Sequence, residues 1–170
     1  RLKTGHCLAA DQEALGALTV ANIGLMDPPD MQAFEALEEG DLATQLPVRP
    51  RAAHKGSNGR VLLYCGSLGM AGAAAMAALG CLRAGAGLVT IACDERIIPV
   101  LQVLAPNATC LPLAQALDAP PRHDVLLAGC GLGKGPGVWQ GLSRLYDAGQ
   151  PAVLDADALN LLAQHPMRLG

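Results

Sequence analysis

The strongest constraint on the fold of this chain is a series of apolar segments that each lead into a glycine-rich turn. RVLLYC at 60–65 is followed by GSLG at 66–69, and VLLAG at 125–129 leads into CGLG at 130–133. Continuous apolar runs are typical of parallel strands covered on both faces, and glycine at a strand end lets a ligand approach the backbone closely. The pattern predicts an α/β fold, with a doubly wound, mostly parallel sheet.

Strands and helices are expected to alternate from residue 59 onward. We expect strands at 60–65, 87–92, 108–111, 124–128 and 152–154, and helices at 70–84, 95–104, 136–148 and 158–163. Ligands of such sheets bind at the carboxyl ends of the strands. The segments 66–69, 129–133 and 155–160 all fall at those ends, so we expect one ligand site along this edge.

The first 53 residues differ in character from the rest of the chain. Residues 1–27 are interpreted as loop plus one strand at 17–24. Residues 28–53 are rich in proline and acidic side chains, and they are interpreted as a linker. A helix is expected at 31–39, with Asp30 as its N-cap.

Composition excludes several classes of protein. The chain is 51% hydrophobic, enough for a sizeable core, and its net charge of −3 with no basic run argues against a nucleic-acid partner. Charges and glycines interrupt every apolar run before the ~18 residues that a membrane span needs. The six cysteines and four histidines lack metal-ligand spacing, so we expect no metal site and reduced thiols in a cytoplasmic protein.

Two carboxylates and an amide stand out after the last expected strand. Asp155 follows that strand directly, where its side chain can face the crevice and bind sugar hydroxyls or a magnesium-water shell. Asp157 is expected to cap a helix that begins at Ala158. Asn160 lies on the first turn of that helix, where it either bonds to a ligand or fixes the loop.

The remaining candidates are a lysine and a set of small residues. Lys55 precedes the first strand beside a glycine, as a phosphate contact or as part of a solvated loop. The glycines from 129 to 135 fail the dinucleotide fingerprint because Lys134 stands where the third glycine should fall. They form either a turn that offers N–H groups to a phosphate or ribose, or a tight turn without a ligand. Gly72 and Ala73 begin a helix, whose N-terminus attracts anionic groups.

These segments resemble, in order and spacing, the C-terminal domain of the NAD(P)H-hydrate repair enzymes, the ADP- or ATP-dependent dehydratases of ribokinase-like fold. The resemblance covers 59–163. Cys130 stands where the family usually has proline, in Gly-Pro-Gly-Leu-Gly. The resembling segments are HKGSNGRVLLYCGSLGMAGAA from residue 54, LRAGAGLVTIA from 82, DVLLAGCGLG from 124 and AVLDADALNLLA from 152.

The resemblance also implies a domain organisation. Residues 1–27 resemble the tail of an NAD(P)H-hydrate epimerase domain, 28–53 would connect the domains, and 54–170 would be the N-terminal part of the dehydratase domain. The family's Thr-Pro-His-Pro-Gly-Glu and Gly-x-Gly-Asp motifs are not found in the sequence. The second motif carries the catalytic base, so we expect the base beyond residue 170, the chain to be an excerpt of a longer one, and this polypeptide to be inactive alone.

The implied function is repair of hydrated nicotinamide cofactors. A lyase of this family dehydrates (S)-NAD(P)H-hydrate to NAD(P)H with ADP or ATP and Mg²⁺, and in bifunctional members an epimerase (an isomerase) interconverts the two hydrate epimers. The resemblance gives no preference between ADP and ATP and leaves homo-oligomerisation open. The implied substrate-binding residues are Lys55, Gly66, Gly72, Ala73, Gly129, Gly131, Gly133, Asp155 and Asn160.

Two other functions remain open from the sequence. One is a sugar or vitamin kinase of the same superfold, which shares the glycine turns at the carboxyl edge. The other is a non-catalytic nucleotide-binding or scaffolding module that needs no base. Neither alternative implies a nucleic-acid or membrane partner.

Overall fold

The computed structural model describes residues 16–19, 21, 23–24, 40–41 and 49–165. The chain divides into two units, Arg1–Val48 and Arg49–Gly170. The expected strand at 17–24 is absent at its described positions, which have irregular backbone. A strand needs a hydrogen-bonded neighbour, and the described residues of the first unit include no second strand. The expected helix at 31–39 and its cap lie outside the described residues.

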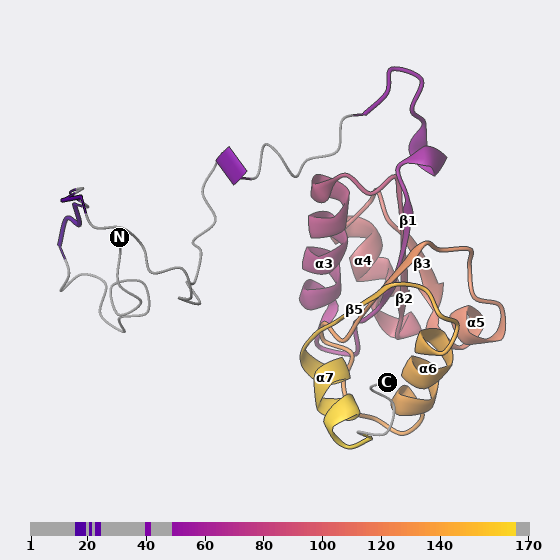
Figure 1. Ribbon diagram of the computed structural model, residues 1–170. Helices are drawn as coiled ribbons and strands as arrows, with labels where there is room; N and C mark the ends of the chain where they lie inside the picture. Colours follow the sequence, from indigo (N-terminus) through magenta and orange to yellow (C-terminus); the bar gives the residue numbers. More distant parts are fainter. Residues whose placement is uncertain (1–15, 20, 22, 25–39, 42–48, 166–170) are drawn as a thin grey trace. The chain divides into compact units, whose positions relative to one another are not determined.

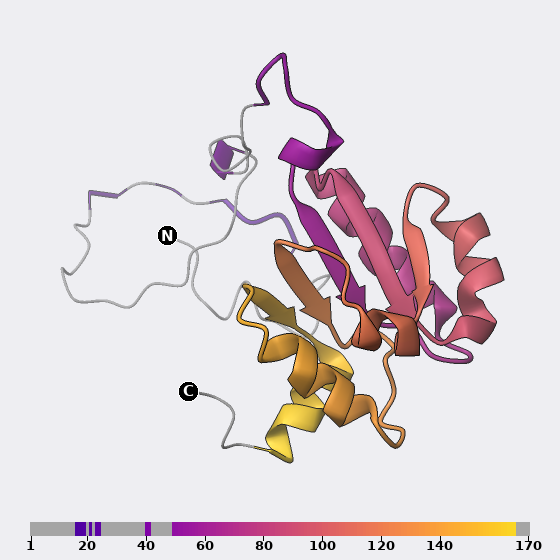
Figure 2. The same ribbon diagram turned by 90° about the vertical axis from the view of Figure 1, so that its right-hand side faces the viewer.

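The second unit is built on a five-stranded parallel sheet (Figures 1 and 2). In the order β3-β2-β1-β4-β5, Tyr64 of β1 pairs with Ala92 of β2 on one side and with Ala128 of β4 on the other. Each strand lies within one residue of its expected bounds, and the doubly wound fold is confirmed. The strands are β1 (Arg60–Tyr64), β2 (Leu88–Cys93), β3 (Thr109–Pro112), β4 (Val125–Ala128) and β5 (Ala152–Leu154).

Helices cover both faces of this sheet (Figure 1). One face packs against α3 and α4, and the other packs against α5, α6 and α7. Chain order reverses beside β1, since β2 and β3 lie on one side of it and β4 and β5 on the other. The helical elements are η2 (Lys55–Ser57), α3 (Ala71–Ala84), η3 (Glu95–Ile97), α4 (Ile98–Leu104), α5 (Leu113–Asp118), α6 (Val138–Tyr146) and α7 (Ala156–Ala163).

Strand β1 shows why these strands are continuously apolar. Leu62 and Tyr64 face the cluster formed with α5, α6 and α7, whereas Leu63 and Cys65 face the cluster formed with α3 and α4. All four are fully buried. The Tyr64 hydroxyl donates a hydrogen bond to the carbonyl of Val138 at 3.2 Å, and burial raises the pKa of Tyr64 to about 12.

The helices depart from expectation in several places, and the expected helix at 95–104 is divided into the 3-10 turn η3 and the helix α4. Helix α5 was not among the expected helices, because a six-residue segment between Pro112 and Ala119 is too short for a periodic pattern. Helix α6 begins two residues later than expected because Gly137 before it is left-handed, with φ 84°. Helix α7 begins at Ala156, two residues earlier than expected, and this changes the role of Asp157.

The described cysteines are free thiols, as expected, and Cys7 lies outside the described residues. Cys65 and Cys93 are buried, and Cys81, Cys110 and Cys130 are half-buried. Burial raises the pKa of Cys93 to about 12, so its thiol packs as an apolar group. Among the described helices, none combines the length and the hydrophobicity that a membrane crossing requires.

Candidate functional site

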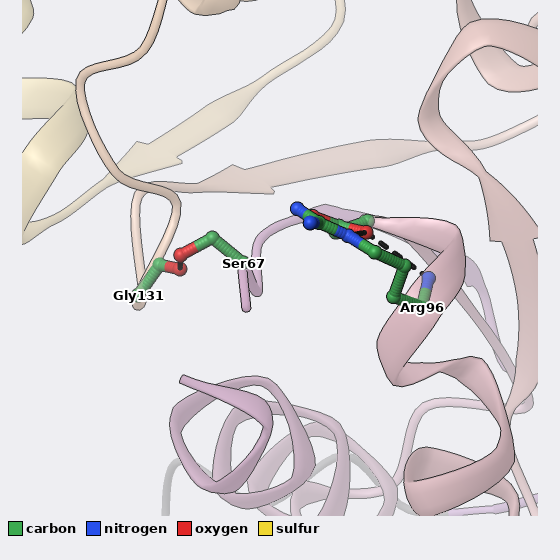
Figure 3. Close-up of polar contacts among 4 residues, drawn as sticks. Ser67, Arg96 and Gly131 are labelled. Atoms are coloured by element: carbon green, nitrogen blue, oxygen red, sulfur yellow. Dashed lines mark hydrogen bonds and ion pairs between the residues drawn. The ribbon is translucent and has the colours of Figure 1, made fainter. Parts of the chain in front are cut away.

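The glycine turns after β1 and β4 meet where the chain order reverses. Gly66 N donates to the carbonyl of Cys130 at 3.1 Å, and the Ser67 hydroxyl donates to the carbonyl of Gly131 at 2.9 Å (Figure 3). Gly66 has φ 82°, and a Cβ there would lie 2.9 Å from the Cβ of Ala74. Parallel sheets bind ligands at this type of switch point. At this switch point the crevice is lined by the backbone of the two glycine turns rather than by long side chains.

The turn after β4 is glycine-rich for steric reasons. A Cβ on Gly129 would lie 1.8 Å from the carbonyl oxygen of Asp155, and one on Gly131 would lie 2.8 Å from the Cβ of Met70 and 3.0 Å from that of Ala73. The turn therefore fits between the chain leaving β5 and the beginning of α3. This close approach brings three segments, distant in sequence, to one place.

Asp155 lies at the carboxyl end of β5 and is exposed, as expected. Its N–H donates to the carbonyl of Ala128 at 3.0 Å, which fixes its backbone to β4. The next residue, Ala156, has φ 43°. A non-glycine residue in this region costs about 1 to 2 kcal/mol, so the turn is strained where its carboxylate is presented.

Cys130 contacts the Asp155 carboxylate directly. Its Sγ donates to Asp155 Oδ2 at 3.6 Å. Burial, and then the bond to Asp155, raise the pKa of the Cys130 thiol. The thiol therefore stays protonated beside an exposed carboxylate and serves as a hydrogen-bond donor.

Asp157 does not cap a helix that begins at Ala158. Because α7 already begins at Ala156, Asp157 lies in its first turn, and Asp155 occupies the N-cap position. The Asp157 carboxylate instead accepts a hydrogen bond from Gly133 N at 2.8 Å. Asp157 thereby ties α7 to the glycine turn, and its negative charge is favourable near a helix N-terminus.

The structure brings the other predicted residues to the carboxyl edge, with one exception. Gly72 and Ala73 lie in the first turn of α3, and Asn160 is exposed on α7. Lys55 lies in η2, before β1, and therefore at the opposite edge of the sheet. A Cβ on Gly87 at the start of β2 would lie 1.8 Å from the Lys55 carbonyl oxygen, so Gly87 allows the backbone at Lys55 to pack against it.

A pocket of about 550 Å³ opens at the carboxyl ends of β1, β2 and β3. Gly66, Ser67, Asp94, Arg96 and Gly133 are among its lining residues. Asp94 N donates to the Gly66 carbonyl at 3.2 Å, which joins the turns after β1 and β2.

Arg96 forms a bidentate ion pair with the Asp94 carboxylate through two side-chain nitrogens. Arg96 Nε donates to Oδ1 at 2.9 Å, and Nη2 donates to Oδ2 at 2.5 Å. These bonds lower the pKa of Asp94 to about 2. The Arg96 side chain remains 63% exposed, and its guanidinium end lies on the side facing the Ser67 turn (Figure 3).

Sequence reasoning missed Ser67, Asp94 and Arg96. Asp94 carries the signal that identified Asp155, a carboxylate directly after an apolar strand, and the same rule could have found it. Arg96 gives no comparable signal, because its bidentate contact depends on the turn of η3. Among the described residues, no group of three or more His, Cys, Asp or Glu side chains is placed to hold a metal ion.

Comparison with known proteins gives a consistent set of relatives. The family model described as NAD(P)H-hydrate dehydratase matches residues 61–169. The bifunctional NAD(P)H-hydrate repair enzyme Nnr of Coxiella burnetii is 40% identical over 157 residues, covering 89% of this chain and 32% of that protein. The ADP-dependent (S)-NAD(P)H-hydrate dehydratase of Streptococcus thermophilus is 40% identical over 134 residues, covering 74% of this chain and 48% of that protein.

A solved structure agrees with these sequence relatives. The ADP/ATP-dependent NAD(P)H-hydrate dehydratase of Bacillus subtilis, co-crystallized with ATP and Mg²⁺, superposes with a TM-score of 0.65 at 35% identity. The superposition covers 72% of this chain and 46% of that one. The chain thus spans between about a third and a half of the length of these relatives. On the match of the family model and of these relatives, the chain belongs to the NAD(P)H-hydrate dehydratase family.

Proposed function

We propose that the full-length protein repairs hydrated nicotinamide cofactors by nucleotide-dependent dehydration of (S)-NAD(P)H-hydrate to NAD(P)H, in a chain that also carries NAD(P)H-hydrate epimerase. The observation that carries the proposal is the meeting of the Gly66 and Gly131 turns beside the exposed Asp155. Relatives that bear this activity in their names support it.

The reaction has two balanced stages. The hydroxyl of the hydrate attacks the terminal phosphorus of ADP or ATP, its proton passes to a base, and the nucleotide leaves one phosphate shorter. The C–O bond of the resulting phosphate ester then breaks, inorganic phosphate leaves, and loss of a ring proton restores the double bond of NAD(P)H. We place the base beyond residue 170, and phosphoryl transfer also needs positioned anion stabilisers.

The described residues would bind and orient the hydrate. Gly66, Gly129, Gly131 and Gly133 provide turns without side chains, so the ligand can approach the backbone closely. Gly72 and Ala73 begin α3, whose N-terminus favours anionic groups. Asp155 and Asn160 would lie near the nicotinamide end. Lys55 is left out of this set because of its place at the amino edge.

Magnesium would enter the reaction with the nucleotide. Among the described residues, no group of three or more His, Cys, Asp or Glu side chains could hold it. We further propose that the protein acts in the cytoplasm, where the free thiols of the described cysteines would stay reduced. The net charge of −3 gives no reason to propose a nucleic-acid partner.

The test is recovery of NADH from purified (S)-NADH-hydrate by the full-length protein, with Mg²⁺ and either ADP or ATP. The expected result is nucleotide-dependent return of the NADH absorbance, together with release of inorganic phosphate. Phosphorylation of a sugar or vitamin without NADH recovery would favour the kinase alternative. Binding of the hydrate without turnover by the full-length protein would favour a non-catalytic module.

A further inference from the structure

The pocket lined by Asp94 and Arg96 does not include Asp155 or Asn160, the two residues placed near the nicotinamide. It is lined by the segments that follow β1, β2 and β3 and by the turn that follows β4, whereas Asp155 follows β5 at the far side of the sheet and does not line it. Its volume of about 550 Å³ is in the range of small-molecule sites, about 300 to 1,000 Å³. Gly66, Ser67 and Gly133 line its wall, so the pocket is continuous with the glycine turns.

The position of Asp94 suggests what the pocket binds. In doubly wound sheets that bind dinucleotides, a glycine turn follows the first strand, and a carboxylate at the end of the second accepts a ribose hydroxyl. Here Gly66 follows β1, Asp94 follows β2, and the two are joined by the 3.2 Å bond from Asp94 N to the Gly66 carbonyl. The strand order β3-β2-β1-β4-β5 also matches the first five strands of the dinucleotide-binding order 3-2-1-4-5-6.

The charges of the pocket indicate which ribose it favours. Its charged lining residues are Asp94, Glu95 and Arg96, which sum to one negative charge. Arg96 is engaged by both oxygens of Asp94. Oδ1 accepts from the Arg96 backbone N–H and from Nε, whereas Oδ2 accepts only from Nη2 and keeps a second lone pair for a hydroxyl donor. A phosphate group would meet the Asp94 carboxylate and would have to draw Arg96 away from it.

We propose that this pocket takes the ribose that carries the 2′-phosphate in NADPH, and that Asp94 accepts its 2′-hydroxyl and disfavours a 2′-phosphate. The consequence is a preference for NADH-hydrate over NADPH-hydrate. This inference rests on the proposed function, because it takes the dinucleotide hydrate as the ligand. Arg96 is then a positioning residue that holds the Asp94 carboxylate in place.

The first test measures dissociation constants of NAD⁺ and NADP⁺ by calorimetry, with the full-length protein and its Asp94→Ser variant. Serine also caps helices, so this variant keeps the cap that Asp94 provides to Arg96 N. We expect the preference for NAD⁺ over NADP⁺ to fall about tenfold in the variant, because like-charge repulsion is removed. Equal preference in the two proteins, with both shown to be folded by circular dichroism, would overturn the inference.

A matched control removes a different carboxylate from the same pocket. Glu95 neighbours Asp94 and also lines the pocket. Glu95→Gln removes the same charge without removing a proposed contact to the ribose, so it should lower the preference clearly less than Asp94→Ser does. If it changes the preference as much as Asp94→Ser, the effect is general electrostatics, and the assignment of Asp94 is wrong.

Arg96→Gln separates the inference from its nearest rival, in which Arg96 binds the 2′-phosphate. If Asp94 sets the preference, this variant should still prefer NAD⁺, because Asp94 retains its charge, although the preference should weaken because Asp94 loses its positioning partner. A selective loss of NADP⁺ affinity would support the rival and overturn the assignment.

Titration of ADP distinguishes the two sources of a ribose diol, the dinucleotide hydrate and the phosphoryl donor. If Asp94→Ser weakens binding of ADP but leaves both dinucleotides unchanged, the pocket belongs to the donor, and the inference fails. A shifted dinucleotide preference without any dehydration would instead contradict the proposed function alone. Dehydration without a shifted preference would contradict this inference alone.

Discussion

The amino edge of the sheet, where its parallel strands begin, and the carboxyl edge, where they end, both contain closely packed glycines. Only the carboxyl edge has the features of a ligand site. At the amino edge, Gly87 N donates to the carbonyls of Asn58 and Gly59, and Asp124 Oδ2 accepts from Arg60 N at 2.8 Å. These polar groups hold the beginnings of β1, β2 and β4 together. At the carboxyl edge, similar close packing around Gly129 presents the exposed Asp155 and adjoins a pocket with Asp94.

The comparison shows that glycine density by itself does not mark a site. Both Gly87 and Gly129 would place a Cβ 1.8 Å from a carbonyl oxygen, so both are required for packing. The carboxyl edge differs because the crevice at the switch point beside β1 opens outside the carboxyl ends of the strands, and because carboxylates follow these strands. Lys55 illustrates the difference, since its glycine-rich surroundings stabilise the beginning of β1 and β2.

The largest effect is expected when alanine replaces either of these two glycines. Gly129→Ala should lower the free energy of unfolding by about 3 kcal/mol or more, because overpacking adds to the strain of φ 120°. Gly87→Ala should lower it by about 2 to 3 kcal/mol through overpacking alone. Urea denaturation measures both values in the full-length protein.

The same pair separates the roles of the two edges. At a temperature where both variants are folded, Gly87→Ala should keep the parent kcat for dehydration, whereas Gly129→Ala should lose activity. Equal loss of activity in the two folded variants would contradict the distinction between the edges.

A smaller effect is expected from two aspartates that make the same bond at opposite edges. Asp124 Oδ2 accepts from Arg60 N and Asp157 Oδ2 accepts from Gly133 N, each at 2.8 Å. Replacing either residue by alanine should cost about 1 to 2 kcal/mol of stability, as for a charged hydrogen-bond acceptor. Dehydration should fall in Asp157→Ala alone, because that change loosens the turn ending at Gly133. Parallel thermal melts and initial rates provide the measurement.

The smallest effect comes from two exposed glycines of the same helix. A Cβ on Gly72 or on Gly80 would meet nothing within 4 Å, and both residues lie within α3. Alanine at either position should raise stability by up to about 1 kcal/mol through helix propensity. Gly72→Ala should also raise the KM for the hydrate, since it adds a methyl group at the carboxyl edge. Gly80→Ala is the control, and an equal change of KM in both would remove Gly72 from the site.

Much of the fold could be predicted because strand and helix patterns are local. Each strand expected from residue 59 onward is found, since an apolar run such as Leu62 to Cys65 is buried on both faces. The missed α5 is six residues long and has no clear period. The early beginning of α7 requires Ala156 to adopt φ 43°, directly after Asp155, whose N–H donates to Ala128 of β4, and no local pattern predicts this contact.

The site was predicted less completely, because its geometry depends on contacts between distant residues. Placing Asp155 required only its position after a strand. The hydrogen bond from Gly133 N to the Asp157 carboxylate joins residues 24 positions apart, and no local sequence pattern predicts it. Lys55 was placed with the site because it is near a glycine, although a residue before a parallel strand belongs to the opposite edge.

The most direct test of the two-edge account compares kcat/KM for hydrate dehydration in Asp155→Asn and Lys55→Ala of the full-length protein. Asparagine preserves the shape of the exposed Asp155, so folding should be unaffected. We predict a loss of about tenfold or more for Asp155→Asn, or about 1.4 kcal/mol of transition-state stabilisation. Lys55→Ala should remain within about twofold of the parent, as for an ordinary surface change. A loss in Lys55→Ala with full activity in Asp155→Asn would contradict the account.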